Sequence, residues 1–470
     1  MKNKASKAEK KSELFKSDYQ RTFFSIFWAL AVMFNAFRQG THLDRGFAGF
    51  VSILLYAAAA ILLMKPSSIF RLQAVAVLGT VEFFLLLPQM ANHLFILGVV
   101  NLALTLIFGF KKLKGKLPED WFNEVAPFLR LLFVIIYGAS AIAKLNSGFF
   151  RAQTSCAYVL SNREFAWLGI DIDFNNYQFF PYLIAATELA IFVGLLSRWT
   201  RPYAFILACL FHTSLSLTPV SQGLGFTYAL YAFTNLFLPI EAKIESINKA
   251  RYWQVKIDKK IPMDVFKMLY AVVAVVIALA FLVTSINQFL YTAIRWFLTL
   301  MILLIFTVGL VYLSLKFRKN QVAKPVFKVK GAIQIITLFL VVLTALSPYL
   351  GIKTRPTFTM YSNLKVEANE SNHFLIPRLF PNNLADDVVT IVNSSDSELQ
   401  ADANAGVQWI YLELQRKLQK SPNTVITFVR DGKTYSLKRA SDDPDLINPN
   451  PILAKFLSFR KVYPGEKCSW

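Results

Sequence analysis

Lys144 ends a long apolar run, and most of the residues before it are small. Residues 137 to 150 read YGASAIAKLNSGFF, with Gly138, Ser140 and Ala143 just ahead of the lysine. A neutral lysine amine is a strong general base, and burial away from water favours the neutral form. Lys144 is therefore a candidate catalytic base. The alternative is a membrane anchor whose amine reaches the lipid headgroups.

Lys144 can accept a proton only if its surroundings keep the amine uncharged. An ordinary lysine has a pKa near 10.4, and lowering that value by about three units requires roughly 4 kcal/mol. The small neighbouring residues allow close helix packing, and no acidic residue lies within one helical turn of Lys144. We expect a dry pocket that destabilises the ammonium form.

The elements that position this lysine are expected to be membrane helices. Hydrophobic residues make up 55% of the chain and charged residues only 17%, which is too apolar for an ordinary soluble domain. A membrane core of about 30 Å requires about 20 largely apolar residues in a helix. The sequence predicts an all-α polytopic membrane helix bundle of about nine to twelve spans. We place eleven spans near 22–37, 47–64, 70–88, 93–110, 125–143, 178–196, 202–217, 223–239, 268–285, 295–314 and 332–350.

The net charge of +21 is explained by the expected topology. In a soluble chain such a charge would suggest a nucleic-acid partner. With a cytoplasmic N-terminus, however, the inner segments hold 28 Lys and Arg residues and the short outer segments hold 6. This asymmetry follows the positive-inside rule. We predict an integral multi-pass protein in the lipid bilayer, with a basic cytoplasmic tail (1–21), a transmembrane bundle (22–350) and no nucleic-acid partner.

Residues 351–470 are predicted to form a small extracytoplasmic α+β domain. The stretch NTVITFVRDGKTYSLKRA alternates apolar and polar residues on both sides of Asp431-Gly432, which predicts a hairpin with a two-residue turn. Upstream, AGVQWIYLELQRKLQ has a helical apolar period. We expect one helix whose apolar face carries Val407, Ile410, Leu414 and Leu418.

Cys156 and Cys468 both fall on the outer side of the membrane in this topology, whereas Cys209 lies in a span. An oxidising compartment would permit a bridge. Nothing in the sequence brings the two Cα atoms within about 7 Å, so we expect two free cysteines. The Cys and His spacing of a zinc site is absent from the sequence, and no metal is predicted.

The same topology places all four histidines, together with Lys144, in the outer half of the membrane or outside it. Polar groups at such positions are costly and tend to mark functional sites. Asn92 and His93 lie where the chain re-enters the membrane, and His212 lies in the seventh span. Asn92 is alternatively a helix N-cap, and His212 alternatively bonds between helices. The remaining histidines are His42 in the first outer loop and His373 in the outer domain.

Two carboxylates lie within apolar runs. Glu82 is in the third predicted span and Glu188 is in the sixth. A carboxylate at such a position is not expected to face lipid. Each is interpreted either as paired with a structural partner or as part of a proton path.

Four motifs in this chain are similar to motifs of a known membrane-protein family. YGASAIAKLN is similar to a Tyr-x-x-small-x-x-x-Lys-Leu-(Asn/Asp) signature, MANHLFI contains an Asn-His pair before an apolar helix, and LFHTSLSL contains a later Phe-His pair. FTMYSNLKVEANESNHFLIP follows the last predicted span. Together, from about residue 20 to 380, the chain resembles vitamin K-dependent gamma-carboxylase and its relatives, the HTTM membrane proteins, bacterial ones in particular.

The resemblance implies an enzyme that uses a hydroquinone, either reduced vitamin K or a menaquinol. In that reaction a lysine deprotonates the hydroquinone, and O2 converts it into a strong base and finally an epoxide. The strong base removes a γ-proton from a protein glutamate, to which CO2 adds. By the same resemblance Lys144 and His93 are catalytic, and Asn92, His212 and Asn146 bind the substrate.

Differences from the family leave other functions open. Ala143 and Leu215 replace a lysine and an asparagine found in relatives, and the outer domain of about 120 residues is much smaller than that of the animal enzyme. Epoxidation is therefore favoured over carboxylation of a protein substrate. The alternative is a non-catalytic membrane protein that acts as a lipid or small-molecule binder, a transporter or a scaffold.

Overall fold

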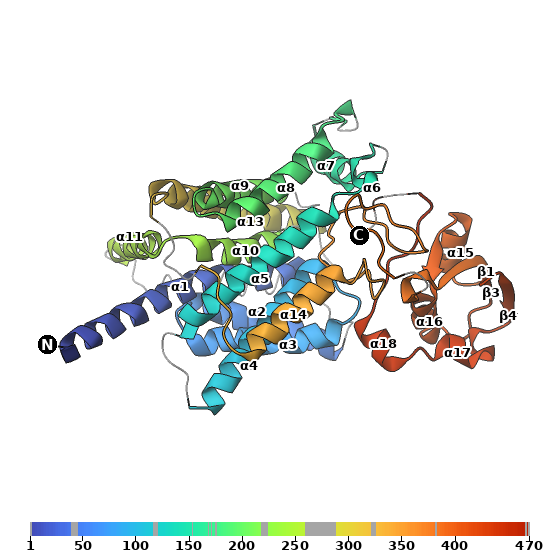
Figure 1. Ribbon diagram of the computed structural model, residues 1–470, viewed down its shortest axis with the longest axis horizontal. Helices are drawn as coiled ribbons and strands as arrows, with labels where there is room; N and C mark the ends of the chain where they lie inside the picture. The colour runs from blue at the N-terminus through green and yellow to red at the C-terminus, as the bar shows by residue number, and fades with distance from the viewer. Residues whose placement is uncertain are drawn as a thin grey trace. The chain divides into compact units, whose positions relative to one another are not determined.

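The computed structural model is mostly helical, with one small sheet near the C-terminus (Figure 1). It describes residues 2–38, 46–115, 121–152, 154–167, 169–170, 172–173, 176–217, 224–258, 288–320, 326–380, 383–465 and 468. The predicted span 268–285 and His42 lie outside the described residues.

Ten of the eleven predicted spans coincide with helices. Among the described residues, the four helices from α2 to α5 are long and apolar enough to cross a membrane. The ten helices are α1 (Lys2–Arg38), α2 (Phe47–Met64), α3 (Ile69–Leu86), α4 (Asn92–Leu113), α5 (Trp121–Ala143), α8 (Phe180–Leu196), α9 (Arg201–Ser214), α10 (Leu224–Thr234), α13 (Gln288–Lys316) and α14 (Ala332–Leu346).

Helix α2 shows why these runs suit lipid. Its sequence FAGFVSILLYAAAAILLM contains no charged residue. Val51 and Leu55 are buried, whereas Phe50 and Ile61 are 54% and 49% exposed. A helix that is apolar on all of its faces belongs either in a large core or in a membrane. The exposed apolar side chains are therefore compatible with a lipid environment.

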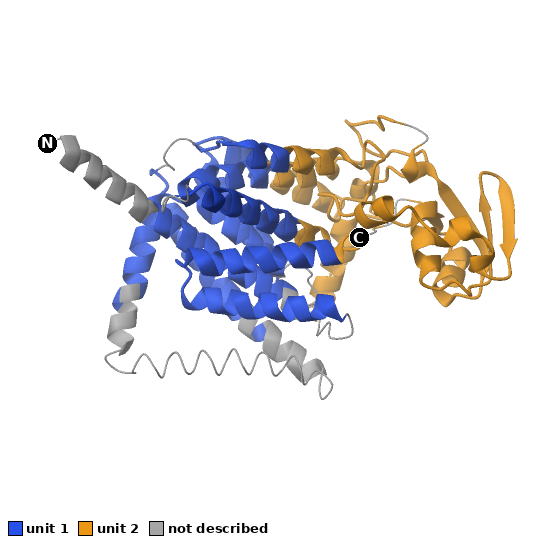
Figure 2. Ribbon diagram, turned by 90° about the horizontal axis from the view of Figure 1, so that it is seen from below, with its two compact units in different colours: residues 1–85, 96–134, 190–338 blue, residues 86–95, 135–189, 339–470 orange. Residues whose placement is uncertain are grey.

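The chain divides into two compact units (Figure 2). The first comprises residues 1–85, 96–134 and 190–338, and the second comprises 86–95, 135–189 and 339–470. The second unit thus combines the C-terminal residues with two earlier segments, 86–95 and 135–189. The predicted domain that begins at residue 351 does not include these segments. The short helices α6 (Ser147–Phe150) and α7 (Cys156–Trp167) belong to the second unit, and η3 (Asn235–Phe237) and α11 (Ile240–Asp258) to the first.

Polar contacts join helices in the core of the first unit. The Trp28 indole donates to Asn101 Oδ1 at 2.9 Å. The hydroxyl groups of Thr213, Tyr231 and Thr307 lie 2.6 to 2.9 Å from one another. Buried hydrogen bonds between helices are a usual form of packing in membrane proteins.

The C-terminal residues form a four-stranded antiparallel sheet in the order β2-β1-β3-β4. The predicted hairpin is confirmed, because β3 and β4 are joined by Asp431 and Gly432 with φ angles of 51° and 73°. Such angles favour glycine, aspartate and asparagine. The strands are β1 (Val388–Ser394), β2 (Gln408–Ile410), β3 (Ile426–Arg430) and β4 (Lys433–Leu437). The helices are η4 (Leu384–Asp386), α15 (Ser397–Asn404), α16 (Tyr411–Gln419), η5 (Ala440–Asp442), α17 (Pro444–Ile447) and α18 (Pro451–Phe456).

The prediction of one helix from Val407 to Leu418 is wrong in its first part. Residues 408–410 form β2, and α16 begins only at Tyr411. Pairing with β1 decides this, because Ile410 lies opposite Val388 in an antiparallel register. The expected burial of Val407, Ile410, Leu414 and Leu418 is nevertheless observed.

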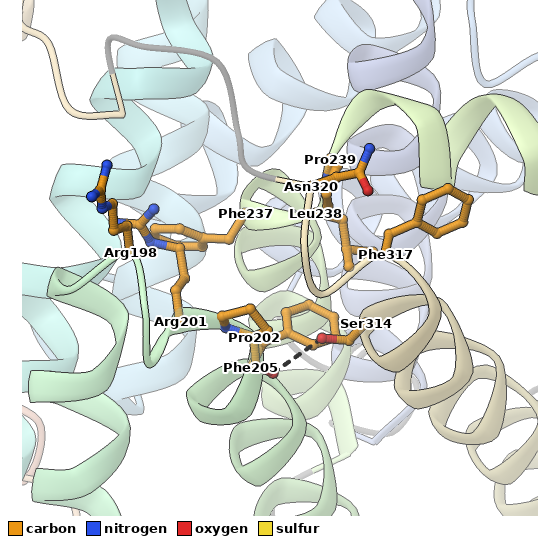
Figure 3. Close-up of a pocket in the computed structure, with 10 residues that line it drawn as sticks. All are labelled: Arg198, Arg201, Pro202, Phe205, Phe237, Leu238, Pro239, Ser314, Phe317 and Asn320. Atoms are coloured by element: carbon orange, nitrogen blue, oxygen red, sulfur yellow. Dashed lines mark hydrogen bonds between the residues drawn. The ribbon is translucent and has the colours of Figure 1, made fainter.

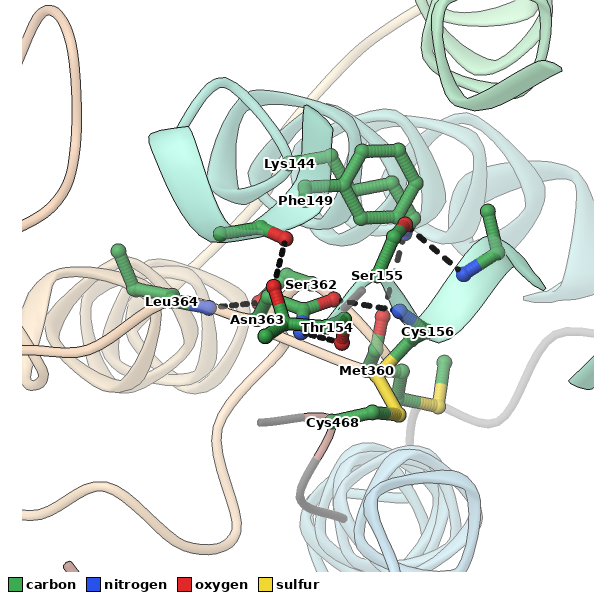
Figure 4. The surroundings of a disulfide bond; sticks show 12 residues. Lys144, Phe149, Thr154, Ser155, Cys156, Met360, Ser362, Asn363, Leu364 and Cys468 are labelled. Carbon is green, nitrogen blue, oxygen red and sulfur yellow. Dashed lines mark hydrogen bonds between the residues drawn. A yellow bond between two sulfur atoms is a disulfide. The ribbon is translucent and has the colours of Figure 1, made fainter. Parts of the chain in front are cut away.

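The prediction of two free outer cysteines is also wrong. Cys156 and Cys468 form a disulfide, with their Cα atoms 4.9 Å apart (Figure 4). Folding brings together two residues separated by 312 positions in the sequence. Cys209 is buried and free.

Candidate functional site

Lys144 follows the last residue of α5, and its side chain is only 5% exposed. Nζ lies 2.9 Å from Glu188 Oε2 and donates to the Met360 carbonyl oxygen at 3.1 Å. Longer contacts join it to the carbonyl and hydroxyl oxygens of Ser140. A snorkelling anchor requires an exposed amine. The burial of Lys144 therefore fits the expected dry pocket and not the anchor.

Glu188 is the feature that the local sequence around Lys144 does not reveal. It lies in α8, and its side chain is 11% exposed. No acid lies within one helical turn of Lys144 in the sequence, but folding brings Glu188 of α8 to it. A carboxylate beside a buried amine stabilises the charged form of both groups. Lys144 is thus buried as part of a pair.

The contact between Lys144 and Glu188 is an ion pair by distance but lacks the geometry of a hydrogen bond. Glu188 Oε2 is consequently buried with no hydrogen-bond donor among the described residues. This oxygen is therefore available to accept a hydrogen bond from a hydroxyl group of a ligand.

Asn146 fixes the chain immediately after Lys144. Its side chain accepts from the Phe149 backbone N–H at 2.9 Å, which caps α6. Its amide also donates to the carbonyl oxygens of Ala143 and Ser362 at 2.7 and 2.6 Å. These bonds occupy the amide, so the structure gives Asn146 a positioning role. A contact of Asn146 with substrate stays a prediction.

A segment that follows α14 covers the site. Figure 4 shows Lys144 and Phe149 near residues 360–364 of this segment. The Asn363 side chain accepts from the backbone N–H of Cys156 and donates to the carbonyl oxygen of Thr154, both at 2.7 Å. Further along, His373 pairs with Asn146 in an antiparallel bridge. The stretch FTMYSNLKVEANESNHF thus contacts Lys144 directly through Met360 and contacts the residues that follow Lys144 through Asn363 and His373.

His373 supports the end of α5 and is held in its neutral form. Its Nδ1 accepts from the backbone N–H groups of Leu375 and Ile376 at 3.1 and 2.9 Å. Nε2 therefore carries the proton and donates to the Ile142 carbonyl oxygen at 2.9 Å. Burial lowers the pKa of His373, although the bond to Ile142 opposes this effect.

Asn92 and His93 begin α4 and belong to the same unit as Lys144. Asn92 Oδ1 is buried without a hydrogen-bond donor among the described residues. The rings of Phe95 and Phe358 are 6.0 Å apart. Met360, two residues after Phe358, is the carbonyl partner of Lys144. The segment 358–360 therefore contacts both the first turn of α4 and the lysine.

Two further residues near this segment were not singled out from the sequence. Lys353 is 9% exposed, its amine lies 4.7 Å from the centre of the Phe95 ring, and burial lowers its pKa to about 8. Tyr349 is buried against Ala143, and its hydroxyl has no hydrogen-bond partner among the described residues. Both lie in the stretch SPYLGIK, which contains no motif that would predict a functional site.

His212 lies in the first unit, not with Lys144. It is 5% exposed, and its ring contacts those of Phe211 and Phe226 edge to face. His212 is in α9 and Phe226 is in α10, so the His212 ring packs against α10. Its role in substrate binding stays a prediction.

The charged groups at the centre of this site are an amine, Lys144, and a carboxylate, Glu188. No group of three His, Cys, Asp or Glu residues suited to a metal ion occurs in the described part of the chain. No protein-family model, curated protein or solved structure matches this chain. The resemblance to the gamma-carboxylase relatives therefore rests on the four sequence motifs.

Proposed function

We propose that this chain is a multi-pass membrane enzyme that deprotonates a hydroquinone at Lys144 and supports its oxygen-dependent epoxidation, as in vitamin K-dependent gamma-carboxylase. One observation carries the proposal. A buried amine lies 2.9 Å from a buried carboxylate oxygen that has no hydrogen-bond donor among the described residues. Such a pair can receive both a hydroxyl group and its proton.

The proton balance favours Lys144 over Glu188 as the final acceptor. A phenolic hydroxyl has a pKa of about 10, as in tyrosine, which is close to that of an ordinary amine. Transfer from a phenol to an ordinary carboxylate is uphill by roughly 8 kcal/mol. In the proposed step Lys144 reacts in its neutral form and accepts the phenolic proton, which leaves a phenolate and a Lys144 ammonium. Glu188, 2.9 Å away, then stabilises that ammonium.

A hydroquinone carries two hydroxyl donors, and the second unit offers buried acceptors for them. Glu188 Oε2 and Asn92 Oδ1 are both buried without a donor among the described residues. Tyr349 adds a buried hydroxyl without a hydrogen-bond partner. Leaving such groups unsatisfied is costly, and a ligand that pairs with them gains that free energy. His93, next to Asn92, is assigned to catalysis by the resemblance.

The membrane placement belongs to the same proposal. Four apolar helices support several spans, and the positive-inside rule assigns the N-terminus to the cytoplasm. The disulfide between Cys156 and Cys468 supports an oxidising, extracytoplasmic location for the C-terminal residues. The proposed substrates are therefore a membrane quinol, O2 and, for carboxylation, CO2 with a protein glutamate. The carboxylation step rests on the resemblance alone.

A binder without turnover is the competing function. The ion pair between Lys144 and Glu188 favours it, because a paired buried lysine can be a purely structural element. In that case the chain would hold a quinol or lipid headgroup at the same acceptors and release it unchanged.

Epoxide formation separates these functions. Membranes that contain the protein are incubated with reduced vitamin K or menaquinol under O2, and the epoxide is quantified. We expect the wild type to form epoxide and Lys144→Ala to lose about 100-fold or more, the usual contribution of a general base. Lys365→Ala is the matched control, because Lys365 pairs with Glu370 at 2.6 Å in the same unit. Equal product from Lys144→Ala removes its assignment as base, and bound but unchanged quinol in the wild type favours the binder.

A further inference from the structure

The first unit contains three buried cations without a carboxylate partner. Arg130, Arg201 and Lys243 are 2%, 7% and 0% exposed. Within the described residues, none of them forms an ion pair with a carboxylate. Burying a charge without a counter-charge is strongly unfavourable. A bound anion would relieve such an accumulation.

One short segment holds the two arginines close together. Arg130 Nε donates to the Leu236 carbonyl oxygen at 2.9 Å, and the Arg201 guanidinium lies 5.8 Å from the centre of the next ring, Phe237. Arg130 Nη1 also donates to Val326 O at 2.8 Å. All of these acceptors are neutral. The contacts fix the two guanidinium groups but leave their charges uncompensated.

Lys243 adds a third charge at the start of α11. Its Nζ has no hydrogen-bond partner in the described part of the chain. Burial lowers its pKa, and the nearby charge of Arg130 adds to this effect. Lys243 thus lies near Arg130, and an anion bound in this region would favour its charged form.

The carboxylates near these elements pair with other cations or are exposed. Glu124 contacts Lys111 and Lys330, at 2.6 and 3.1 Å. Glu245 contacts Lys249 and Lys316. Glu241, in the first turn of α11, is exposed and has no ion pair within the described ranges. None of these three glutamates therefore neutralises Arg130, Arg201 or Lys243.

A pocket opens directly beside Arg201 (Figure 3). Arg198 and Arg201 line it together with Ser314 and Asn320. Arg201 uses Nε and Nη2 to bond the carbonyl oxygens of Leu195 and Leu196, which leaves three of its five N–H groups. The cavity measures about 20 Å³. That volume admits about one water-sized group.

We infer that this pocket binds a phosphate group, with Arg201 and Arg198 as direct ligands and Arg130 and Lys243 as buried charges that strengthen the site. Guanidinium groups match phosphate oxygens in shape and charge. The small cavity admits phosphate oxygens at its mouth and excludes a larger anion such as a whole nucleotide. The phosphate is that of a lipid headgroup or a free phosphate ion.

Phosphate binding is measured on the full chain in a neutral detergent. The thermal midpoint is followed with increasing inorganic phosphate, and sodium chloride at the same ionic strength is the reference. We expect phosphate to raise the midpoint of the wild type. Arg201→Gln and Lys243→Met should each raise, about tenfold or more, the phosphate concentration that gives the same increase in the midpoint. Arg198→Gln, at an exposed position, provides a second variant if Arg201→Gln does not fold.

Arg318→Gln is the matched control, because Arg318 is exposed and does not line the pocket. It should respond to phosphate as the wild type does. In nanodiscs, stabilisation by phosphatidic acid relative to an uncharged lipid assigns the site to a headgroup, whereas a response to inorganic phosphate alone assigns it to the free ion. An equal response to chloride, or a full phosphate response in both Arg201→Gln and Arg198→Gln, overturns the inference.

Discussion

Glu188 in α8 and Lys144, the residue after α5, form an ion pair, with Oε2 and Nζ 2.9 Å apart. Each side chain is almost completely buried, at 11% and 5% exposure. A pair of this kind contributes little net stability compared with an apolar pair, but the loss of one partner leaves a buried charge. This asymmetry allows the pair to be tested apart from any enzyme assay.

Glu188→Gln is expected to destabilise the protein by about 3–5 kcal/mol, because it leaves the buried Lys144 amine without a counter-charge. The free energy of unfolding in detergent measures the effect. Glu370→Gln is the control, since Glu370 is 58% exposed in its pair with Lys365 and such pairs contribute about 0–1 kcal/mol. The double variant Lys144→Met/Glu188→Leu should regain much of the loss. Equal effects of Glu188→Gln and Glu370→Gln would contradict the prediction.

Lys353 is predicted to make stability increase with pH in the alkaline range. Its folded pKa of about 8 is below the value of about 10.4 for an exposed lysine, because burial disfavours the ammonium. Between these two values the unfolded chain binds more protons, so the folded state gains stability as pH rises. The penalty is fully present below about pH 8 and amounts to about 3 kcal/mol.

The measurement compares unfolding of the wild type and Lys353→Met from pH 7 to 10.5. The advantage of the methionine variant should be greatest near pH 7 and should shrink toward pH 10.5. Lys365→Met, at a paired lysine in the same unit, should show no such trend. A constant difference between wild type and Lys353→Met across this range would show that Lys353 is not desolvated.

His373 is predicted to loosen the segment around Lys144 on acidification. Its folded pKa is below the ordinary value of about 6.5, so the stability that it contributes is present above about pH 6.5 and is lost as pH falls through the folded pKa. Protonation of Nδ1 breaks the two bonds that it accepts from Leu375 and Ile376. Hydrogen exchange of these two amides, corrected for the intrinsic rate, should accelerate between pH 7.5 and 5. In His373→Gln the acceleration should be absent, and its persistence there would exclude the histidine as its cause.

The disulfide predicts a characteristic pattern among serine variants. Cys156→Ser and Cys468→Ser should each destabilise the protein by about 2–5 kcal/mol, the usual effect of removing a native bridge. The double variant should cost about as much as either single variant, because one bond is lost in all three. Thermal unfolding under non-reducing conditions measures these effects. Additive losses would indicate two independent free cysteines.

Elements that depend on local pattern could be predicted from the sequence. Apolar runs with few or no charges indicated the positions of helices such as α2 and α5, because a helix satisfies its own backbone hydrogen bonds. The alternation around Asp431 and Gly432 gave the hairpin, since its turn needs residues that accept positive φ angles. Lys144 stands out in the sequence as a basic residue at the end of an apolar run.

The partners of these residues depend on tertiary packing and could not be predicted. Glu188 could be recognised as a buried acid, but its pairing with Lys144 depends on how the segments of the second unit pack. The same is true of Cys156 with Cys468 and of β2, which exists because β1 supplies its hydrogen bonds. Contacts between distant residues depend on the packing of the whole chain, and a local pattern of hydrophobic and polar residues does not contain that information.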